Sequence, residues 1–225
     1  MGILGDFISA FLPFCCHSCR QATIFGEVLC AACFEKFSRS LKEPLPVNDT
    51  VCNFPVFTLS QYDSFVADII RLIKYRPSRK LAGYVDKVLQ TKQLLKSFGK
   101  SELIFVPVPM HKARLFQRGF NQAELLSESM ARHCCGISTP ALTRIFATVP
   151  QASCTEEQRL KNLEGAIMLA DGLIPEKFHN RDLVIVDDVA TTGTTLEQCY
   201  QKLLLLKPAS VRALVLSHSF RKLKE

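Results

Sequence analysis

The stretch 183–195, LVIVDDVATTGTT, constrains the fold more than any other part of the chain. Residues 183–186 are all apolar, which is typical of a strand buried on both faces of a parallel sheet. Two adjacent acids, Asp187 and Asp188, follow this run, and a helical pattern begins near Thr194. A buried strand, a turn of small residues and a helix are the elements of an α/β fold.

The remaining chain alternates strand and helix patterns in the same way. Periodicity predicts helices at 63–75, 78–98, 121–134 and 194–207. Asp63 or Ser64 would be the N-cap of the first helix. Asn121 would be the N-cap of the third, with Glu124 completing a capping box. Apolar runs predict strands at 54–62, 103–109, 141–146, 165–169, 183–186 and 211–217. This alternation predicts a parallel sheet that is flanked by helices and connected by right-handed crossovers.

Ligands of such sheets bind at the carboxyl ends of the strands, where we expect Asp187 and Asp188 to lie. Two carboxylates can accept hydrogen bonds from the vicinal hydroxyls of a ribose. The turn that follows can cradle a phosphate, because backbone N–H groups at a helix N-terminus attract anions and glycine permits a tight turn. The cradle residues are Ala190, Thr191, Thr192, Gly193, Thr194 and Thr195. The stretch therefore predicts a ribose 5-phosphate site.

Two other interpretations of the same stretch stay open. The acid pair would suit Mg²⁺ in a phosphoryl-transfer enzyme, or the acids would simply be exposed beside a capped helix. The turn contains no lysine, and the chain has no GxxxxGK[ST] pattern there. A nucleoside triphosphate P-loop is therefore excluded.

The first part of the chain is rich in cysteine. Five of the ten cysteines lie within residues 15–33. The start of the chain lacks a basic segment and carries Asp6, so we expect no signal peptide and a cytoplasmic location. No apolar run approaches the ~18 residues that a membrane span needs. In a reducing compartment, clustered cysteines indicate a metal site rather than disulfides.

The cysteine spacing predicts one structural zinc ion. Cys16 and Cys19 form one CxxC knuckle, and Cys30 and Cys33 form a second. Two such knuckles can direct four thiolates to one tetrahedral ion. Cys15 and His17 are alternative ligands, and we favour Cys16 because both knuckles then have the same spacing.

The positive charge is unevenly distributed. The first 56 residues hold 4 Lys/Arg against 5 Asp/Glu, and the remaining residues hold 24 against 16. The stretches 71–80 and 111–119 are especially basic. This charge suits nucleic acid or phosphorylated small molecules, although solvated helix faces give the same composition. We see no stripe of alternating aromatic and basic residues that would indicate a single-strand binding groove.

These features divide the chain into two units. Residues 1–45 would form an N-terminal helix and the zinc module, with the helix packing Ile3, Leu4, Ile8, Phe11 and Leu12 on the domain. Residues 54–225 would form the α/β domain. The stretch 42–53, with its prolines and Asn48, is typical of a linker.

Four segments of the chain resemble the ComF family, whose members combine a zinc ribbon with a type I phosphoribosyltransferase-like domain. They are the CxxC knuckles, FVPVPMHKARLFQRGFNQAELL (105–126), TVPQASCTEEQRLKNLEGA (148–166) and VIVDDVATTGTT (184–195). The last segment is similar to the phosphoribosyl pyrophosphate signature of type I phosphoribosyltransferases. The resemblance covers nearly the full length.

The resemblance implies roles for particular residues. Asp187 and Asp188 would hold the ribose hydroxyls as the catalytic pair, and Thr191 to Thr195 the 5-phosphate. A pyrophosphate loop, 109–119, would carry His111, Lys112, Arg114 and Arg118, which also fits the positive charge that a leaving pyrophosphate needs. A lid, 147–163, would contribute Gln151, Arg159 and Asn162 and exclude water.

Two functions follow from the resemblance. The first is a phosphoribosyltransferase in which Mg²⁺ accompanies the donor, a nitrogen acceptor attacks C1 and pyrophosphate leaves. The second is a non-catalytic factor for DNA uptake in natural transformation, which binds single-stranded DNA and uses the pocket to sense phosphoribosyl pyrophosphate or another ribose 5-phosphate. The family also implies a competence helicase as a partner.

Overall fold

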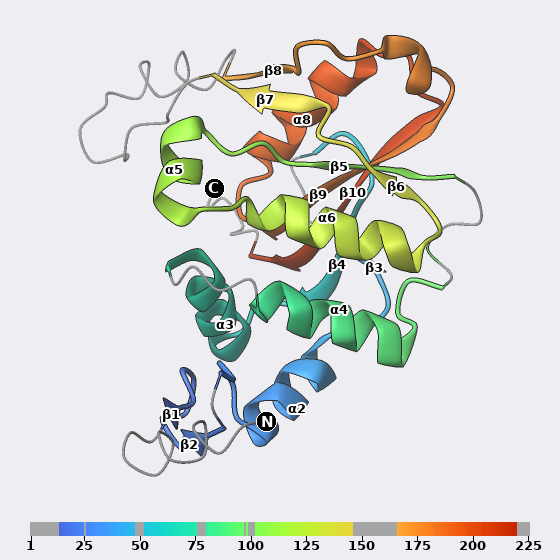
Figure 1. The fold of residues 1–225 in the computed structure, drawn as a ribbon. Coiled ribbons are helices and arrows are strands. Elements are labelled where there is room, and N and C mark those ends of the chain that lie inside the picture. Colours follow the sequence, from blue (N-terminus) through green and yellow to red (C-terminus); the bar gives the residue numbers. More distant parts are fainter. Residues whose placement is uncertain are drawn as a thin grey trace, which may run out of the picture.

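The computed structural model describes residues 14–24, 26–47, 52–75, 80–96, 98, 102–145 and 166–219. A six-stranded sheet forms the centre of this part of the chain (Figure 1). Its strand order is β3 (Leu45–Pro46), β4 (Val56–Gln61), β10 (Ser210–His218), β9 (Asp182–Ala190), β5 (Ile104–Pro107) and β6 (Ile137–Ser138). Neighbouring strands are parallel except β3, which runs antiparallel to β4. The predicted parallel sheet is confirmed.

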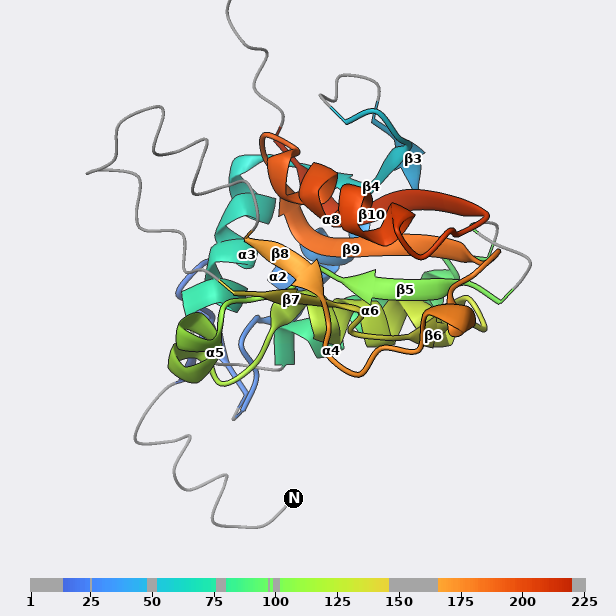
Figure 2. The ribbon, with the colours of Figure 1, turned by 90° about the horizontal axis from the view of Figure 1, so that it is seen from above.

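Helices flank both faces of the sheet, as Figure 2 shows for α4 and α6 on one side and α8 on the other. The helices are α2 (Ala31–Ser40), α3 (Ser64–Tyr75), α4 (Lys80–Lys92), α5 (Lys112–Arg118), α6 (Gln122–His133), α8 (Thr194–Leu204) and the 3-10 helix η1 (Pro175–Lys177). Val184 and Val186 pack in the cluster that includes α3, α4 and α6, whereas Leu183 and Ile185 pack with α8. Strand β9 is therefore buried on both faces, as its apolar run predicts.

The predicted helix caps form at two places. The Oδ1 atom of Asp63 accepts a hydrogen bond from the backbone N–H of Val66 at 2.7 Å, at the start of α3. The side chain of Asn121 caps α6, and its Nδ2 atom donates to the carbonyl of Val108 at 3.0 Å. Glu124 accepts from the Asn121 side chain instead of the backbone N–H that a capping box uses. Asn121 thus joins the start of α6 to the end of β5.

Several element bounds differ from the sequence prediction. Strand β9 continues through the acid pair to Ala190, because its ladder with β10 extends to His218. Helix α4 ends at Lys92, earlier than predicted. The expected strands at 141–146 and 165–169 form β7 (Leu142–Arg144) and β8 (Ile167–Leu169), an antiparallel pair outside the main sheet.

The segment 42–47 covers the outer edge of β4, although its composition is typical of a linker. The backbone N–H of Lys42 donates to the Leu59 carbonyl at 2.7 Å, and that of Val47 donates to the Val56 carbonyl at 2.9 Å. Strand β3 lies between these two hydrogen bonds. Its Pro46 has no backbone N–H, so it leaves no unpaired donor at the edge of the sheet. The connection between α2 and the sheet is therefore part of the sheet.

Helices α4 and α6 are joined by a polar cluster around Asp86. One carboxylate oxygen of Asp86 accepts hydrogen bonds from Ser129 at 2.7 Å, Arg132 at 2.9 Å and His133 at 3.1 Å. Burial raises the pKa of the Asp86 carboxyl, but the three α6 donors outweigh burial and lower the pKa below its ordinary value. The ionised form of Asp86 therefore stabilises the packing of α4 against α6.

The N-terminal part begins with a hairpin of β1 (Phe14–Cys15) and β2 (Ala22–Thr23), followed by α2 (Figure 1). Phe37 and Leu41 from the α2 region are buried in the same apolar cluster as residues of α3, α4 and the sheet. The helix that we expect to pack Ile3 and its neighbours falls in residues 1–13, outside the described ranges. Within those ranges, no helix has the length and apolar character to cross a bilayer.

Candidate functional site

A cleft of about 310 Å³ opens where β5 and β9 end at the carboxyl edge of the sheet. Residues from the loop after β5, helices α5 and α6, strand β7 and the β9–α8 connection line it. The predicted site residues that line the cleft are His111, Arg114, Arg118, Asp187, Asp188, Thr191 and Thr195. The fold thus brings together residues that are separated by about a third of the chain.

The acid pair forms one wall of the cleft. The backbone N–H of Asp188 donates to Oδ1 of Asp187 at 2.8 Å, which orients the first carboxylate. Asp188 is only 5% exposed, so the interpretation in which the acids are simply exposed beside a capped helix is wrong for this residue. The reason is that β9 extends past the acids and keeps them within the β9–β10 ladder. The backbone N–H of Val108 donates to the Val186 carbonyl at 2.9 Å and holds the loop after β5 against this wall.

The turn after β9 contributes only some of its residues to the cleft. Thr191 and Thr195 line the cleft. Thr192 is exposed and Thr194 is half-buried, and neither lines the cleft; their hydroxyl oxygens lie 3.0 Å apart. Ala190 is buried at the end of β9 and does not line the cleft.

Gly193 fixes the geometry of this turn. Its φ of 78° lies in the left-handed region, and it stands at the N-cap position of α8. A glycine adopts this conformation without the steric penalty that a Cβ atom would impose. The residue therefore allows β9 to pass directly into α8, whose N-terminus borders the cleft at Thr195.

Basic side chains form the opposite wall. Helix α5 occupies most of the predicted pyrophosphate loop, and it begins where Nδ1 of His111 accepts a hydrogen bond from the backbone N–H of Ala113 at 3.2 Å. His111, Arg114 and Arg118 line the cleft, but Lys112 does not and is exposed. His111, Arg114 and Arg118 are three and four positions apart and therefore share one side of the helix. Lys112 follows His111 directly and lies on another side.

Arg144 of β7 lines the cleft, and the sequence reasoning missed it. Burial is the main cause that lowers the pKa of its guanidinium, the charge of Arg114 lowers it further, and Asp187 acts in the opposite direction. An arginine keeps its charge at neutral pH despite such shifts. The sequence feature that could have identified Arg144 is its position as the one charged residue in the predicted strand 141–146.

Asn121 and Gln122 also line the cleft and were not predicted as site residues. Both are buried at the start of α6, and Arg118 donates to Oε1 of Gln122 at 3.4 Å. Gln151, Arg159 and Asn162, predicted for the lid, lie outside the described residues. The described cleft is therefore acidic on the β9 side and basic on the α5 and β7 side.

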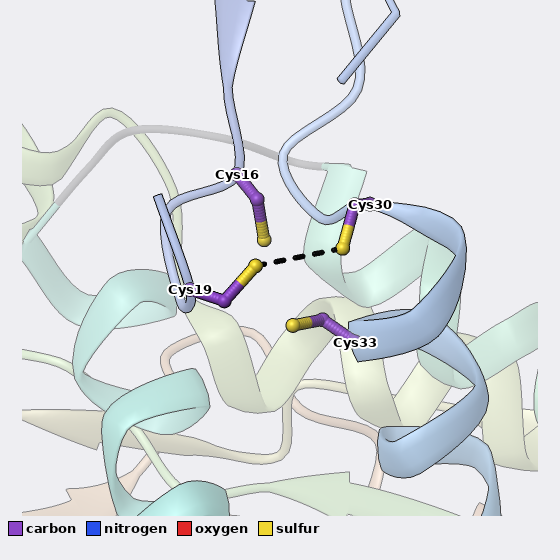
Figure 3. A group of neighbouring side chains, drawn as sticks. All are labelled: Cys16, Cys19, Cys30 and Cys33. Carbon is purple, nitrogen blue, oxygen red and sulfur yellow. Dashed lines mark hydrogen bonds between the residues drawn. The ribbon is translucent and has the colours of Figure 1, made fainter. Parts of the chain in front are cut away.

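A second candidate site is the four-cysteine group of the N-terminal module (Figure 3). The sulfur atoms of Cys16, Cys19, Cys30 and Cys33 all lie within 4.8 Å of one another, with 3.7 Å between those of Cys19 and Cys30. A tetrahedral ion with metal–sulfur bonds of about 2.3 Å separates its ligand sulfurs by roughly 3.8 Å. The group can therefore hold a metal ion.

The local fold explains how the two knuckles meet. The β1–β2 hairpin turns back after Cys16, whose backbone N–H donates to the Gln21 carbonyl at 2.7 Å. Cys30 is the N-cap residue of α2, so Cys33 follows in the first helical turn. The group contains Cys16 and not Cys15 or His17, as the symmetric spacing predicts.

The sheet, the polar cleft at its carboxyl edge and the four-cysteine group together define an α/β protein with an added module that can hold a metal ion. Over 222 residues, the chain is 30% identical to competence protein ComFC of Bacillus subtilis, covering 91% of this chain and 84% of that protein. It is 29% identical over 209 residues to the DNA utilization protein YhgH of Escherichia coli K12, covering 88% and 87%. The chain belongs to the ComF family.

One further relative matches a shorter part of the chain, and one solved structure aligns with most of it. Competence protein F of Haemophilus influenzae is 36% identical over 97 residues, which cover 41% of this chain and 40% of that protein. Adenine phosphoribosyltransferase from Saccharomyces cerevisiae aligns in structure with a TM-score of 0.41 at 12% identity, covering 84% of this chain and 89% of that one. No family model matches the chain.

Proposed function

We propose that the chain is a phosphoribosyltransferase that binds phosphoribosyl pyrophosphate in the cleft and acts in DNA uptake during natural transformation. The observation that carries this proposal is the cleft with the Asp187–Asp188 pair on one wall and Arg114, Arg118 and Arg144 among its other lining residues. Phosphoribosyl pyrophosphate combines a sugar diol with anionic phosphate groups at both ends. Its binding site therefore needs carboxylates for the diol and basic side chains for the phosphates.

The acid wall suits the ribose. Carboxylate oxygens accept hydrogen bonds from hydroxyl groups, and such charge-assisted bonds are stronger than neutral ones. The bond from the Asp188 backbone N–H orients the Asp187 carboxylate before a ligand arrives, which lowers the entropic cost of binding. Asp187 and Asp188 would thus hold the two vicinal hydroxyls.

The N-terminus of α8 suits the 5-phosphate. Thr191 and Thr195 supply hydroxyl donors, and the first backbone N–H groups of a helix attract anions. Gly193 keeps the turn free of a side chain next to these groups.

The basic side chains suit the pyrophosphate. As a nitrogen acceptor attacks C1, the bond between C1 and the pyrophosphate oxygen breaks and negative charge develops on the leaving group. Arg114, Arg118 and Arg144 would stabilise this charge, because fixed positive groups act where charge develops. The Nδ1 atom of His111 accepts a hydrogen bond, so its Nε2–H would be free to donate one to the phosphate groups. Mg²⁺ bound to the donor would neutralise part of the same phosphate charge.

The phosphoryl-transfer alternative would make Asp187 and Asp188 a Mg²⁺ site, since one or two carboxylates together with substrate phosphates are enough to hold this ion. It predicts that replacement of the aspartates lowers only the affinity for Mg²⁺ and leaves the binding of the sugar phosphate unchanged. The transferase proposal predicts that the same replacements weaken the binding of the sugar phosphate itself.

The role in DNA uptake is supported by the relatives, which are named competence and DNA utilization proteins. We assign zinc to the four cysteines because a Cys₄ set is typical of structural zinc. The cytoplasmic location stays a prediction from the start of the sequence, and the helicase partner stays one that rests on the family resemblance.

Calorimetric titration with phosphoribosyl pyrophosphate and Mg²⁺ tests the binding. Asp187→Asn should weaken binding by about 1–3 kcal/mol, because the amide keeps an acceptor but loses the charge. Gly193→Val should weaken it more, since its φ of 78° disfavours a β-branched residue. Asp171→Asn, an exposed acid outside the cleft, is the matched control. Unchanged affinity in both cleft variants would show that the sugar phosphate does not bind here.

Release of pyrophosphate tests the catalysis. The protein, donor and Mg²⁺ are incubated with nucleobases, amines or single-stranded DNA, and pyrophosphate is measured. Acceptor-dependent release would support the transferase. Tight donor binding without release for any acceptor would support the non-catalytic uptake factor instead.

A further inference from the structure

Helix α5 is unusual because none of its residues is buried. Phe116 is 93% exposed, and Leu115 beside it is also exposed. A seven-residue helix is too short to be stable on its own in water, and here the caps at His111 and Gly119 hold it in place. Helix α5 is therefore a capped helix that exposes an aromatic ring to solvent.

The helix combines this ring with positive charge. Lys112 lies four residues before Phe116 and thus on the same side of the helix, and Arg114 is also exposed. The helix contains no acidic residue. Phe116 and Lys112 therefore lie together on one side of the helix, whereas Arg114 lies on the side of the cleft.

The position of α5 connects this surface to the cleft. Arg114 and Arg118 line the cleft while Phe116 and Lys112 do not. Figure 1 shows α5 beside the end of β7, the strand that contributes Arg144. A ligand lying along the outer side of α5 would pass the mouth of the cleft.

We propose that α5 is a stacking platform for single-stranded DNA, in which Phe116 stacks against a base and Lys112 contacts a phosphate. The inference deepens the proposed function, since it names the surface that handles DNA. Single strands expose the faces of their bases, and proteins that bind them pair an aromatic platform with basic groups along the backbone. Charge complementarity favours DNA over an apolar protein partner, because Lys112 lies on the same side of the helix as the ring and the helix contains no acidic residue.

Fluorescence anisotropy with an oligothymidylate of about 16 nucleotides tests the platform. Phe116→Ala should weaken binding about tenfold, and Phe116→Tyr should preserve it, because tyrosine also stacks. Leu205→Ala removes an exposed apolar side chain at the C-cap of α8, far along the sequence from α5, and serves as the matched control. An abasic strand of equal length should bind the parent and Phe116→Ala equally, since it offers no base to stack.

Equal binding of oligothymidylate by the parent and Phe116→Ala would overturn the proposal, as would a parent that binds no single strand. A parent dimer that Phe116→Ala dissociates, without any change in DNA affinity, would assign the surface to a second copy of the chain and also overturn it. The donor titration contains no DNA, so failure of the cleft proposal and failure of the platform are distinguishable.

Discussion

Loss of the metal should destabilise the whole protein and not only the cysteine module. Leu29 precedes the second knuckle, and Phe37 and Leu41 lie on and just after α2. All three are buried, and they belong to the same apolar cluster as Val66 of α3 and Leu89 of α4. The module and the sheet therefore share one core.

The structure sets the size of this effect. Burial of one large apolar side chain contributes about 1.5–3 kcal/mol, so release of the module with these three side chains would cost about 5–9 kcal/mol. The total free energy of unfolding of a domain is about 5–15 kcal/mol. A loss of at least 5 kcal/mol would lower the melting temperature of a chain of this length by about 10 °C or more.

Cys19→Ser tests this prediction, since Cys19 is the exposed member of the group and its replacement buries no new hydroxyl. Metal content is measured on the purified protein, and unfolding is followed by scanning calorimetry. We expect less than one bound zinc per chain and a single transition at a lower temperature. Cys15→Ser, an exposed cysteine next to the group but outside it, should retain metal and melt like the parent.

Two outcomes would refute the reasoning. A second transition at the parent's melting temperature in Cys19→Ser would show that the sheet is stable without the module. Full metal retention in that variant would show that the four cysteines are not the ligand set.

Three further predictions follow from single contacts. The pKa of Asp86 is lowered in the folded protein, so its contribution to the free energy of unfolding should be present above the unfolded pKa of about 3.9 and be lost as the pH falls through the folded pKa. Asp86→Asn should lower the free energy of unfolding by about 1 kcal/mol at neutral pH, and calorimetry should show a weaker loss of stability in acid than for the parent. Gly136→Ala would place a Cβ atom 2.6 Å from the Leu103 carbonyl oxygen and should cost about 1–3 kcal/mol in urea unfolding, with an unchanged midpoint contradicting the geometry. Arg144→Gln should weaken donor binding by about 1.5–3 kcal/mol in calorimetric titration, and an unchanged affinity would remove Arg144 from the site.

The sheet and the caps could be predicted from sequence because their signals are local. The run 183–186 specifies a strand buried on both faces, and Asp63 and Asn121 mark helix starts through hydrogen bonds to residues two or three positions away. The CxxC spacing likewise limits where four thiolates can meet.

The remaining features depend on contacts between distant segments. The burial of Asp188 follows from the length of the β9–β10 ladder, which the residues around the acid do not determine. Arg144 reaches the cleft because β7 pairs with β8 outside the main sheet, and periodicity does not predict that partner. Helix α5 has too few residues and no buried face to show a helical pattern.

The edge of β4 would give a metal ion on the four cysteines an additional role in solubility. Exposed strand edges are templates for pairing with other chains, and segment 42–47 occupies the β4 edge through the bonds of Lys42 and Val47. This segment follows α2 directly, so movement of the module away from the core would pull on it and uncover the strand. A chain that loses its metal would therefore expose a hydrogen-bonding edge together with apolar surface, the two features that promote intermolecular β-pairing and precipitation.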